Sequence, residues 1–254
     1  MIPDWALQQL PSLPIFAVLA GATFIGSLLR GFSGFGSGLL MAPVFSLVMP
    51  PTDVLALVLG INLLTTVQLL PDALRHVNWR LVLRLFIPSL AGLPVGLAVL
   101  HLVDAAVMRK TVSLIVILVA LLMLAGWHYK GRRGLIQDSG AGALSGFMTA
   151  IAGIGGPPVI LYMLSDRALP LVVMRAVSLV YFSLVQGATL VPLALSGSLT
   201  LRQATYTLVL LPVAVLASLL GAYLHRWSMG RHQERVRRIS LFMLLAIGLA
   251  AFVV

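Results

Sequence analysis

Long apolar runs separated by short polar segments fill the chain. A bilayer core of about 30 Å needs roughly 20 apolar residues per helix, and helix is the default because a lipid-exposed backbone must satisfy its own hydrogen bonds. The alternating ten-residue segments of a β-barrel do not occur. The pattern predicts an all-α polytopic integral membrane protein, with one membrane domain over residues 1–254. The uninterrupted runs are residues 54–70, 81–100, 107–126, 169–195, 204–224 and 239–254.

Two further apolar runs are each broken by a glycine cluster, GFSGFGSG at residues 31–38 and GIGGPP at residues 153–158. Because Gly costs about 1 kcal/mol relative to Ala inside a helix, such clusters belong where the backbone lines a cavity or is buried in protein. A helix that restarts after a break points free N–H groups and its positive dipole end at that place, which favours an anion. Close helix packing is the alternative use of these small residues. The limbs are residues 13–29 and 39–49 around the first break, and 140–151 and 159–164 around the second.

The two halves of the chain carry the same landmarks in the same order. After each break comes a span that ends at a proline, Pro71 or Pro192, and then a span with an internal proline followed by a glycine. We therefore predict two inverted repeats, residues 12–127 and 135–254, each a broken-helix hairpin plus three transmembrane helices. Interrupted apolar segments in corresponding positions of two repeats are typical of secondary transporters.

Composition excludes several other classes of protein. Residues of the AVILMFWYC set make up 60% of the chain and charged residues only 9%, which is too few for a soluble domain. The net charge of +10 lies in short patches between the apolar runs, so the expected partner is the lipid bilayer and not nucleic acid. There are no cysteines, and no nucleophile with a base or phosphate-binding loop, so we expect no enzyme and no cofactor. A homodimer is an open alternative.

The charged residues near the membrane point to an anion. All seven acidic residues lie at or beyond span ends and the histidines lie in loops, so no metal site, sodium site or proton relay is expected. Arg30 lies beside the first break, and Arg84 is expected to snorkel to an interface. Arg175 has no acidic partner nearby in the sequence, so it is expected to bind an anion, with snorkelling as the alternative.

We therefore predict a substrate site at the membrane midplane between the two breaks, with Arg175 nearby. Gly155→Val is expected to abolish transport to a greater extent than it reduces the yield of folded protein. Arg175→Lys is expected to weaken anion binding. The predicted binding residues are Ser33, Gly36, Ser37, Gly38, Asn62, Gly153, Gly155, Gly156, Pro157, Arg175 and Gln186.

The motifs also resemble those of a known family. The stretches GFSGFGSGLLMAP, PTDVLAL, HVNWRLVLRLFIPSLAGLPVG, GALSGFMTAIAGIGGPPVILYML and LPLVVMRAVSLVYF are similar to the TauE/SafE sulfite exporters, and the likeness runs from about Pro14 to Val254. The resemblance implies a membrane transporter that exports a small sulfur-containing anion such as sulfite, a sulfonate such as sulfoacetate, or thiosulfate, by alternating access. It also implies a motif role for Arg175. The alternatives are an anion channel, a transporter of small organic carboxylates on the same scaffold, and a non-transporting membrane protein.

The basic residues predict the topology. If each broken segment is a hairpin that returns to its own side, eleven of the fourteen Lys and Arg residues in loops lie on one side and three on the other. If each segment crosses instead, the split has no bias, contrary to the positive-inside rule. We therefore expect a multi-pass protein of the cell inner (plasma) membrane with both termini outside, and with the HYKGRRG and 225–238 loops in the cytoplasm.

Overall fold

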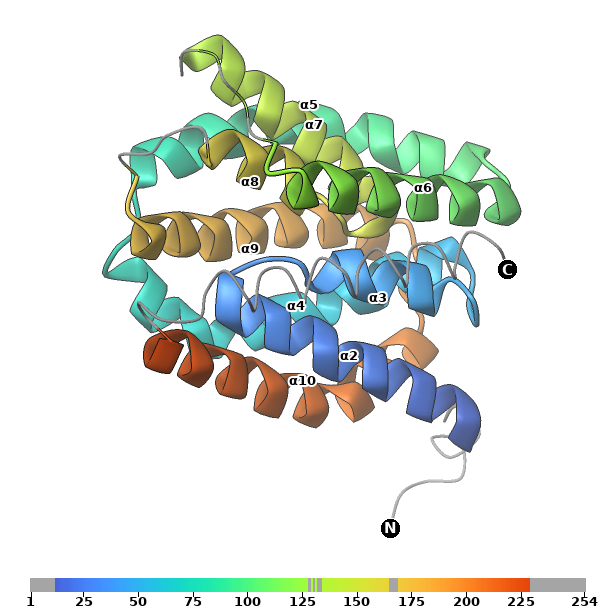
Figure 1. Ribbon diagram of the computed structural model, residues 1–254. Coiled ribbons are helices and arrows are strands. Elements are labelled where there is room, and N and C mark those ends of the chain that lie inside the picture. The colour runs from blue at the N-terminus through green and yellow to red at the C-terminus, as the bar shows by residue number, and fades with distance from the viewer. Residues whose placement is uncertain (1–11, 128, 130, 132–133, 165–168, 229–254) are drawn as a thin grey trace.

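The computed structural model describes residues 12–127, 129, 131, 134–164 and 169–228, and these residues form nine helices joined by turns (Figure 1). Six of the nine helices are long and apolar enough to cross a membrane, which confirms the all-α polytopic architecture. The six are α2 (Leu13–Ser33), α4 (Pro51–Leu74), α5 (Trp79–Leu102), α6 (Ala105–Leu124), α9 (Leu171–Leu195) and α10 (Leu201–Ser228). The other three are α3 (Ser37–Phe45), α7 (Leu135–Ala152) and α8 (Gly156–Met163). The predicted span 239–254 lies outside the described residues.

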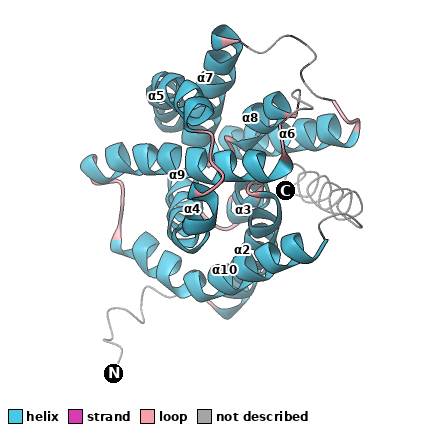
Figure 2. Ribbon diagram, turned by 90° about the vertical axis from the view of Figure 1, so that its left-hand side faces the viewer, coloured by secondary structure: helices cyan, strands magenta, loops and turns pink. Residues whose placement is uncertain are grey.

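Three pairs of helices have the most extensive contacts in the bundle. The central pair is α4 with α9, and it is flanked by α2 with α10 on one side and by α5 with α7 on the other (Figure 2). Each flanking pair joins a broken-helix limb of one half to the third span of the other half. The two flanking pairs are therefore equivalent: each combines the same two elements, one from each half of the chain. The inverted relation between the halves stays a prediction.

Both glycine breaks are turns at which the chain folds back on itself. Gly34 and Gly36 have φ angles of +86° and +98°, which only glycine adopts readily, and they allow α3 to turn back against α2. At the second break Gly153 has a φ of +71°, and the hydroxyl of Ser145 in α7 donates to the carbonyl of Gly155. With nine and eight residues, α3 and α8 are too short to cross a bilayer. The first limb of the second hairpin is longer than expected, because α7 begins at Leu135.

The flanking pairs are held together by glycines in contact with backbone. A Cβ atom on Gly92 of α5 would overlap the carbonyl oxygen of Ala143 in α7, and one on Gly142 of α7 would overlap the carbonyl oxygen of Leu85 in α5. The same arrangement joins α2 to α10. Such close approach is how small residues drive helix association in membranes, where the hydrophobic effect between helices is weak.

Two prolines that were expected to end spans lie inside helices. α4 continues past Pro71 to Leu74, and α9 continues past Pro192 to Leu195. A proline removes one N–H donor and crowds the carbonyl four residues before it. Because Pro71 and Pro192 lie within the last turn of their helices, each removes only one backbone hydrogen bond, and the other backbone hydrogen bonds keep the last three residues helical.

Candidate functional site

A small cavity lies where the two hairpin turns meet beside α4 and α9, and we call it the central cavity. Its volume is about 20 Å³, which is room for one or two water-sized groups. The two turns touch beside it, since a Cβ on Gly38 would overlap the carbonyl oxygen of Gly153. Eight of the eleven predicted binding residues line the central cavity: Gly36, Ser37, Gly38, Asn62, Gly153, Gly155, Gly156 and Gln186.

Both short helices begin at the central cavity. The first amides of α3 and α8 have no partner within their own helix, and each helix dipole presents its positive end there. The two ends are not equivalent. α3 starts with Ser37, Gly38 and Leu39, which all carry an N–H group, whereas α8 starts with a glycine followed by Pro157 and Pro158, which carry none. The α3 side of the cavity is therefore richer in hydrogen-bond donors.

The charged residue of the central cavity is Arg30, not Arg175. Arg30 lies in α2, is 2% exposed, and lines the cavity. Its Nη2 donates to Oγ1 of Thr66 at 2.6 Å, and its Nε is buried without a partner. No carboxylate in the described part of the chain pairs with it. A buried guanidinium without an acid is costly unless an anion or further acceptors complete it.

A hydrogen-bond network links Arg30 to the first hairpin turn. Thr66 Oγ1, which accepts from Arg30, donates to the carbonyl of Asn62 at 2.7 Å. Asn62 Oδ1 accepts from the hydroxyl of Ser37 at 2.7 Å, which leaves the buried Nδ2 of Asn62 without a partner at the cavity. The arrangement gathers a guanidinium, an amide N–H₂ and the start of α3 around one side of the cavity. Gln186 Oε1 is also buried without a partner there.

Arg175 has protein partners on both of its terminal nitrogens. Its Nη1 lies 3.5 Å from Oδ2 of Asp72 at the end of α4, and its Nη2 donates to the carbonyl of Gly31 at 2.9 Å. Asp72 is 103 residues away in the sequence, so the pairing was invisible from sequence spacing. The expectation of an unpaired Arg175 is therefore wrong, and the side chain does not line the central cavity.

The other residues that were singled out from the sequence lie outside the cavity lining and contact other parts of the protein. Pro157 is buried in the first turn of α8 without lining the cavity. Ser33 also lies outside the lining, and its hydroxyl is 2.8 Å and 2.9 Å from the carbonyl oxygens of Leu29 and Phe35. Arg84 does not simply snorkel, because its Nη1 lies 3.6 Å from Oδ2 of the buried Asp138. The nearest sequence signal for Arg30 was its place immediately before the glycine break.

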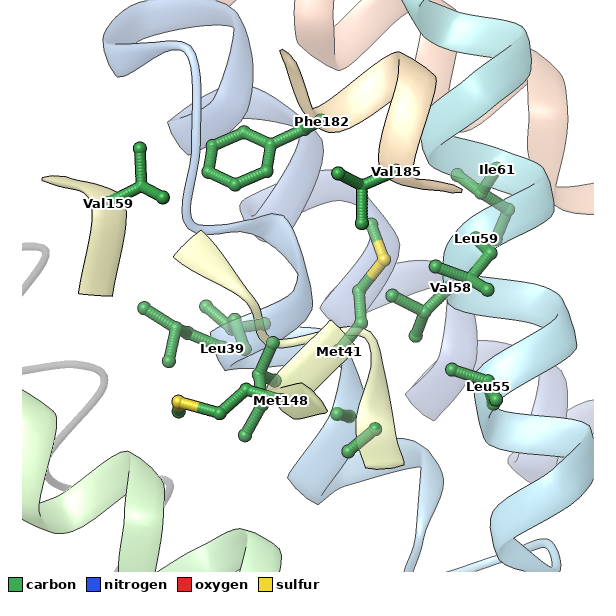
Figure 3. Packing of buried hydrophobic residues seen from close by; sticks show 14 of the residues in the cluster. Leu39, Met41, Leu55, Val58, Leu59, Ile61, Met148, Val159, Phe182 and Val185 are labelled. Carbon is green, nitrogen blue, oxygen red and sulfur yellow. The ribbon is translucent and has the colours of Figure 1, made fainter. Parts of the chain in front are cut away.

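Apolar side chains pack densely around the cavity. Figure 3 shows Met41, Val58 and Val185, from α3, α4 and α9, pointing toward one another. In the same view the ring of Phe182 lies beside the chain that joins α2 to α3. Dense apolar packing keeps water away from this part of the core.

Broken helices whose ends meet at a cavity inside a membrane bundle are typical of secondary transporters. Residues 18–251 match the family described as Sulfite exporter TauE/SafE, and the chain belongs to that family of membrane exporters. A probable sulfite/organosulfonate exporter TauE of Cupriavidus necator is 27% identical over 249 residues, covering 94% of this chain and 93% of that protein. No solved structure matches the chain. Family membership confirms a transporter and not an enzyme.

Proposed function

We propose that the chain exports a small sulfur-containing oxyanion, such as sulfite, that binds in the central cavity. The observation that carries this proposal is the buried guanidinium of Arg30, which faces the cavity without a carboxylate partner among the described residues. An oxyanion supplies the missing negative charge and accepts hydrogen bonds in the planar fork geometry that arginine offers. The name of the Cupriavidus necator relative supports the same class of substrate.

The start of α3 adds to the attraction for an anion. The N–H groups of Ser37, Gly38 and Leu39 and the Nδ2 of Asn62 are donors to the oxygens of the substrate, and the positive dipole end of α3 favours its charge. Donors that are held in place by the protein do not need to be reorganised when the ion arrives. An anion bound here exchanges its hydration shell for fixed protein dipoles.

Transport follows from the meeting of two hairpins, one from each half of the chain. The contact of Gly38 with the carbonyl of Gly153 joins the hairpins directly beside the cavity. In this structure the cavity holds only one or two water-sized groups. In our proposal one half rocks against the other around this contact, which opens the cavity to the anion from first one side of the membrane and then the other. Export of an anion needs no coupling ion, since a membrane potential of 100 mV drives one negative charge outward with about 2.3 kcal/mol.

The test is flux in proteoliposomes that contain the purified full chain. Sulfite trapped inside should leave at a saturable rate in the presence of a membrane potential, and empty liposomes are the control. Absence of flux for sulfite, thiosulfate and sulfoacetate would overturn the proposal. Faster efflux with acetate or lactate than with any sulfur oxyanion would favour the carboxylate transporter, and single-channel currents would favour the channel.

A further inference from the structure

The lining of the central cavity divides into a polar side and an aromatic side. The polar side is the network of Arg30, Asn62 and Ser37 described above. The aromatic side consists of Phe35 and Phe182, which stand over the start of α8. A sulfur oxyanion has the same division, since its oxygens carry the charge and its remaining substituent is a lone pair, a sulfur atom or a carbon.

The two rings converge on Gly156. A Cβ on Gly156 would lie 3.6 Å from Cδ2 of Phe35 and 3.8 Å from Cζ of Phe182, which is ordinary van der Waals contact. Both rings therefore lie close to the backbone of Gly156 and close this side of the cavity. The adjacent prolines at the start of α8 have no N–H group, so this side of the cavity offers few donors to oxygen.

Both rings are held by their surroundings. Phe35 lies between the two left-handed glycines of the first turn, and its carbonyl is 2.9 Å from the hydroxyl of Ser33. Phe182 is 5% exposed in the middle of α9, and its ring packs edge-to-face on Tyr181 with 5.1 Å between centroids. Moving either ring disturbs the turn or the core, so the rings act as a wall.

We propose that Phe35 and Phe182 are specificity-determining residues, which admit a sulfur oxyanion with no substituent or one short substituent and exclude longer sulfonates. The inference rests on the proposed function and adds the size limit of the substrate. With the oxygens on Arg30 and the start of α3, the substituent points toward the aromatic side, where Phe35 and Phe182 close the cavity.

Competition against sulfite efflux measures this limit. Methanesulfonate, ethanesulfonate, propanesulfonate and hexanesulfonate are added to the reconstituted full chain, and the half-inhibitory concentration is measured for each. Each methylene that does not fit a pocket costs about 10- to 200-fold. Propanesulfonate has two methylenes more than methanesulfonate, so we expect it to inhibit at least about 100-fold more weakly.

Substitutions that shorten Phe35 or Phe182 should raise the size limit for the sulfonate, and a larger side chain at Gly156 should lower it. Phe182→Ala and Phe35→Leu should reduce the difference between methanesulfonate and propanesulfonate to less than about threefold, and Gly156→Ala should weaken methanesulfonate relative to sulfite. Phe86→Ala is the matched control, because Phe86 does not line the cavity and its loss should leave the ratios unchanged. If Phe182→Ala does not fold, Phe182→Leu replaces it.

The outcomes separate the two proposals. Saturable sulfite efflux with equal inhibition by all four sulfonates, or with ratios that the wall variants leave unchanged, would overturn the size limit and leave the exporter intact. Absence of sulfite efflux from the wild-type chain would overturn the proposed function itself. In that case the same sulfonates, assayed by their shift of the unfolding temperature, still show whether the cavity binds them in order of size.

Discussion

Two buried arginines, Arg30 and Arg175, lie close together near the end of α2. We assign them different roles because their partners differ. Arg175 donates to the carbonyl of Gly31, the residue that follows Arg30, and pairs with Asp72. Arg30 has only a hydroxyl partner for its guanidinium among the described residues, that of Thr66. A charge that the protein already neutralises has little left to offer a substrate, so Arg30 is the stronger candidate for the anion-binding residue.

Removing the charge of Arg30 should stop transport while the fold survives. Charged hydrogen bonds contribute about 1.5–3 kcal/mol, so we expect Arg30→Gln to weaken sulfite binding about 10- to 100-fold. A buried charge without an acidic partner carries a desolvation cost, so the unfolding temperature in detergent should stay the same or rise when that charge is removed. Arg80→Gln, at an exposed position, is the control. Wild-type affinity in Arg30→Gln would contradict the assignment.

Two neighbouring glycines of the second break should respond differently to a methyl group. A Cβ on Gly155 would overlap Oγ1 of Thr149 and the carbonyl of Ser145, whereas Gly156 has normal contacts. We expect Gly155→Ala to lower folded yield, and the larger change to valine to lower it further, contrary to the expectation from sequence. Gly156→Ala should fold at wild-type yield and transport sulfite more slowly. Yield by size-exclusion chromatography and flux per folded protein measure the two effects, and the reverse pattern would contradict them.

At the scale of helices, the contact between α5 and α7 depends on the absence of side chains. Gly142 of α7 faces the carbonyl of Leu85, while Gly140, half a turn away, has open space around it. Overpacking costs about 1–3 kcal/mol, so Gly142→Ala should lower the unfolding temperature. Gly140→Ala is the matched control in the same helix and should raise stability by up to about 1 kcal/mol, since alanine is the better helix former. Equal effects of the two variants would refute close packing at Gly142.

The ion pair of Arg175 should act on helix docking more than on substrate affinity. One guanidinium bridges the end of α4 at Asp72 and the end of α2 at Gly31, with two different nitrogens. A lysine has a single nitrogen and cannot keep both contacts in the same geometry. We expect Arg175→Lys to lower the unfolding temperature, with a loss of about 1.5–3 kcal/mol, while the KM for sulfite changes less than threefold. A raised KM with unchanged stability would return Arg175 to the substrate site.

At the scale of the whole molecule, the connections between helices gather at two opposite ends of the bundle. The turn between α4 and α5 and the start of α9 lie at one end, and the turns between α5 and α6 and between α9 and α10 lie at the other (Figure 1). Two side-chain contacts agree with this arrangement. Asp72 meets Arg175 at the first end, and Gln203 donates to Asp53 at the other.

The positive-inside rule predicts the orientation of the protein in the membrane. We expect the end that holds the turn between α4 and α5, with Arg75 and Arg80, to face the cytoplasm, and the start of α2 to face outward. Single cysteines at His76 and Leu199, both exposed, are suitable reporters because the chain contains no other cysteine. An impermeant thiol reagent added to intact cells should modify only the cysteine at Leu199. Modification of both from the same side, or of the cysteine at His76 alone, would refute this orientation.

The local sequence was sufficient to predict the membrane helices of this protein and the positions of the breaks in them. Apolar length and the lack of charges require membrane helices, and two glycine clusters require breaks in those helices, because a glycine-rich segment at membrane depth must be covered by protein. Eight residues that were predicted from the sequence to bind substrate, six of them in those breaks, line one cavity. The inverted relation of the two halves and the substrate itself are still predictions.

Only the tertiary structure decided which arginine carries the free charge. Arg175 pairs with Asp72 across 103 residues, and Arg84 with Asp138 across two halves of the chain. Likewise the aromatic wall forms between Phe35, in the turn between α2 and α3, and Phe182, in α9 of the other half. An apolar pattern depends on neighbours along one helix and can be recognised from the sequence. The partner of a side chain depends on how helices that are far apart in the sequence pack against each other, and the order of residues along the chain does not show which side chains that packing brings together.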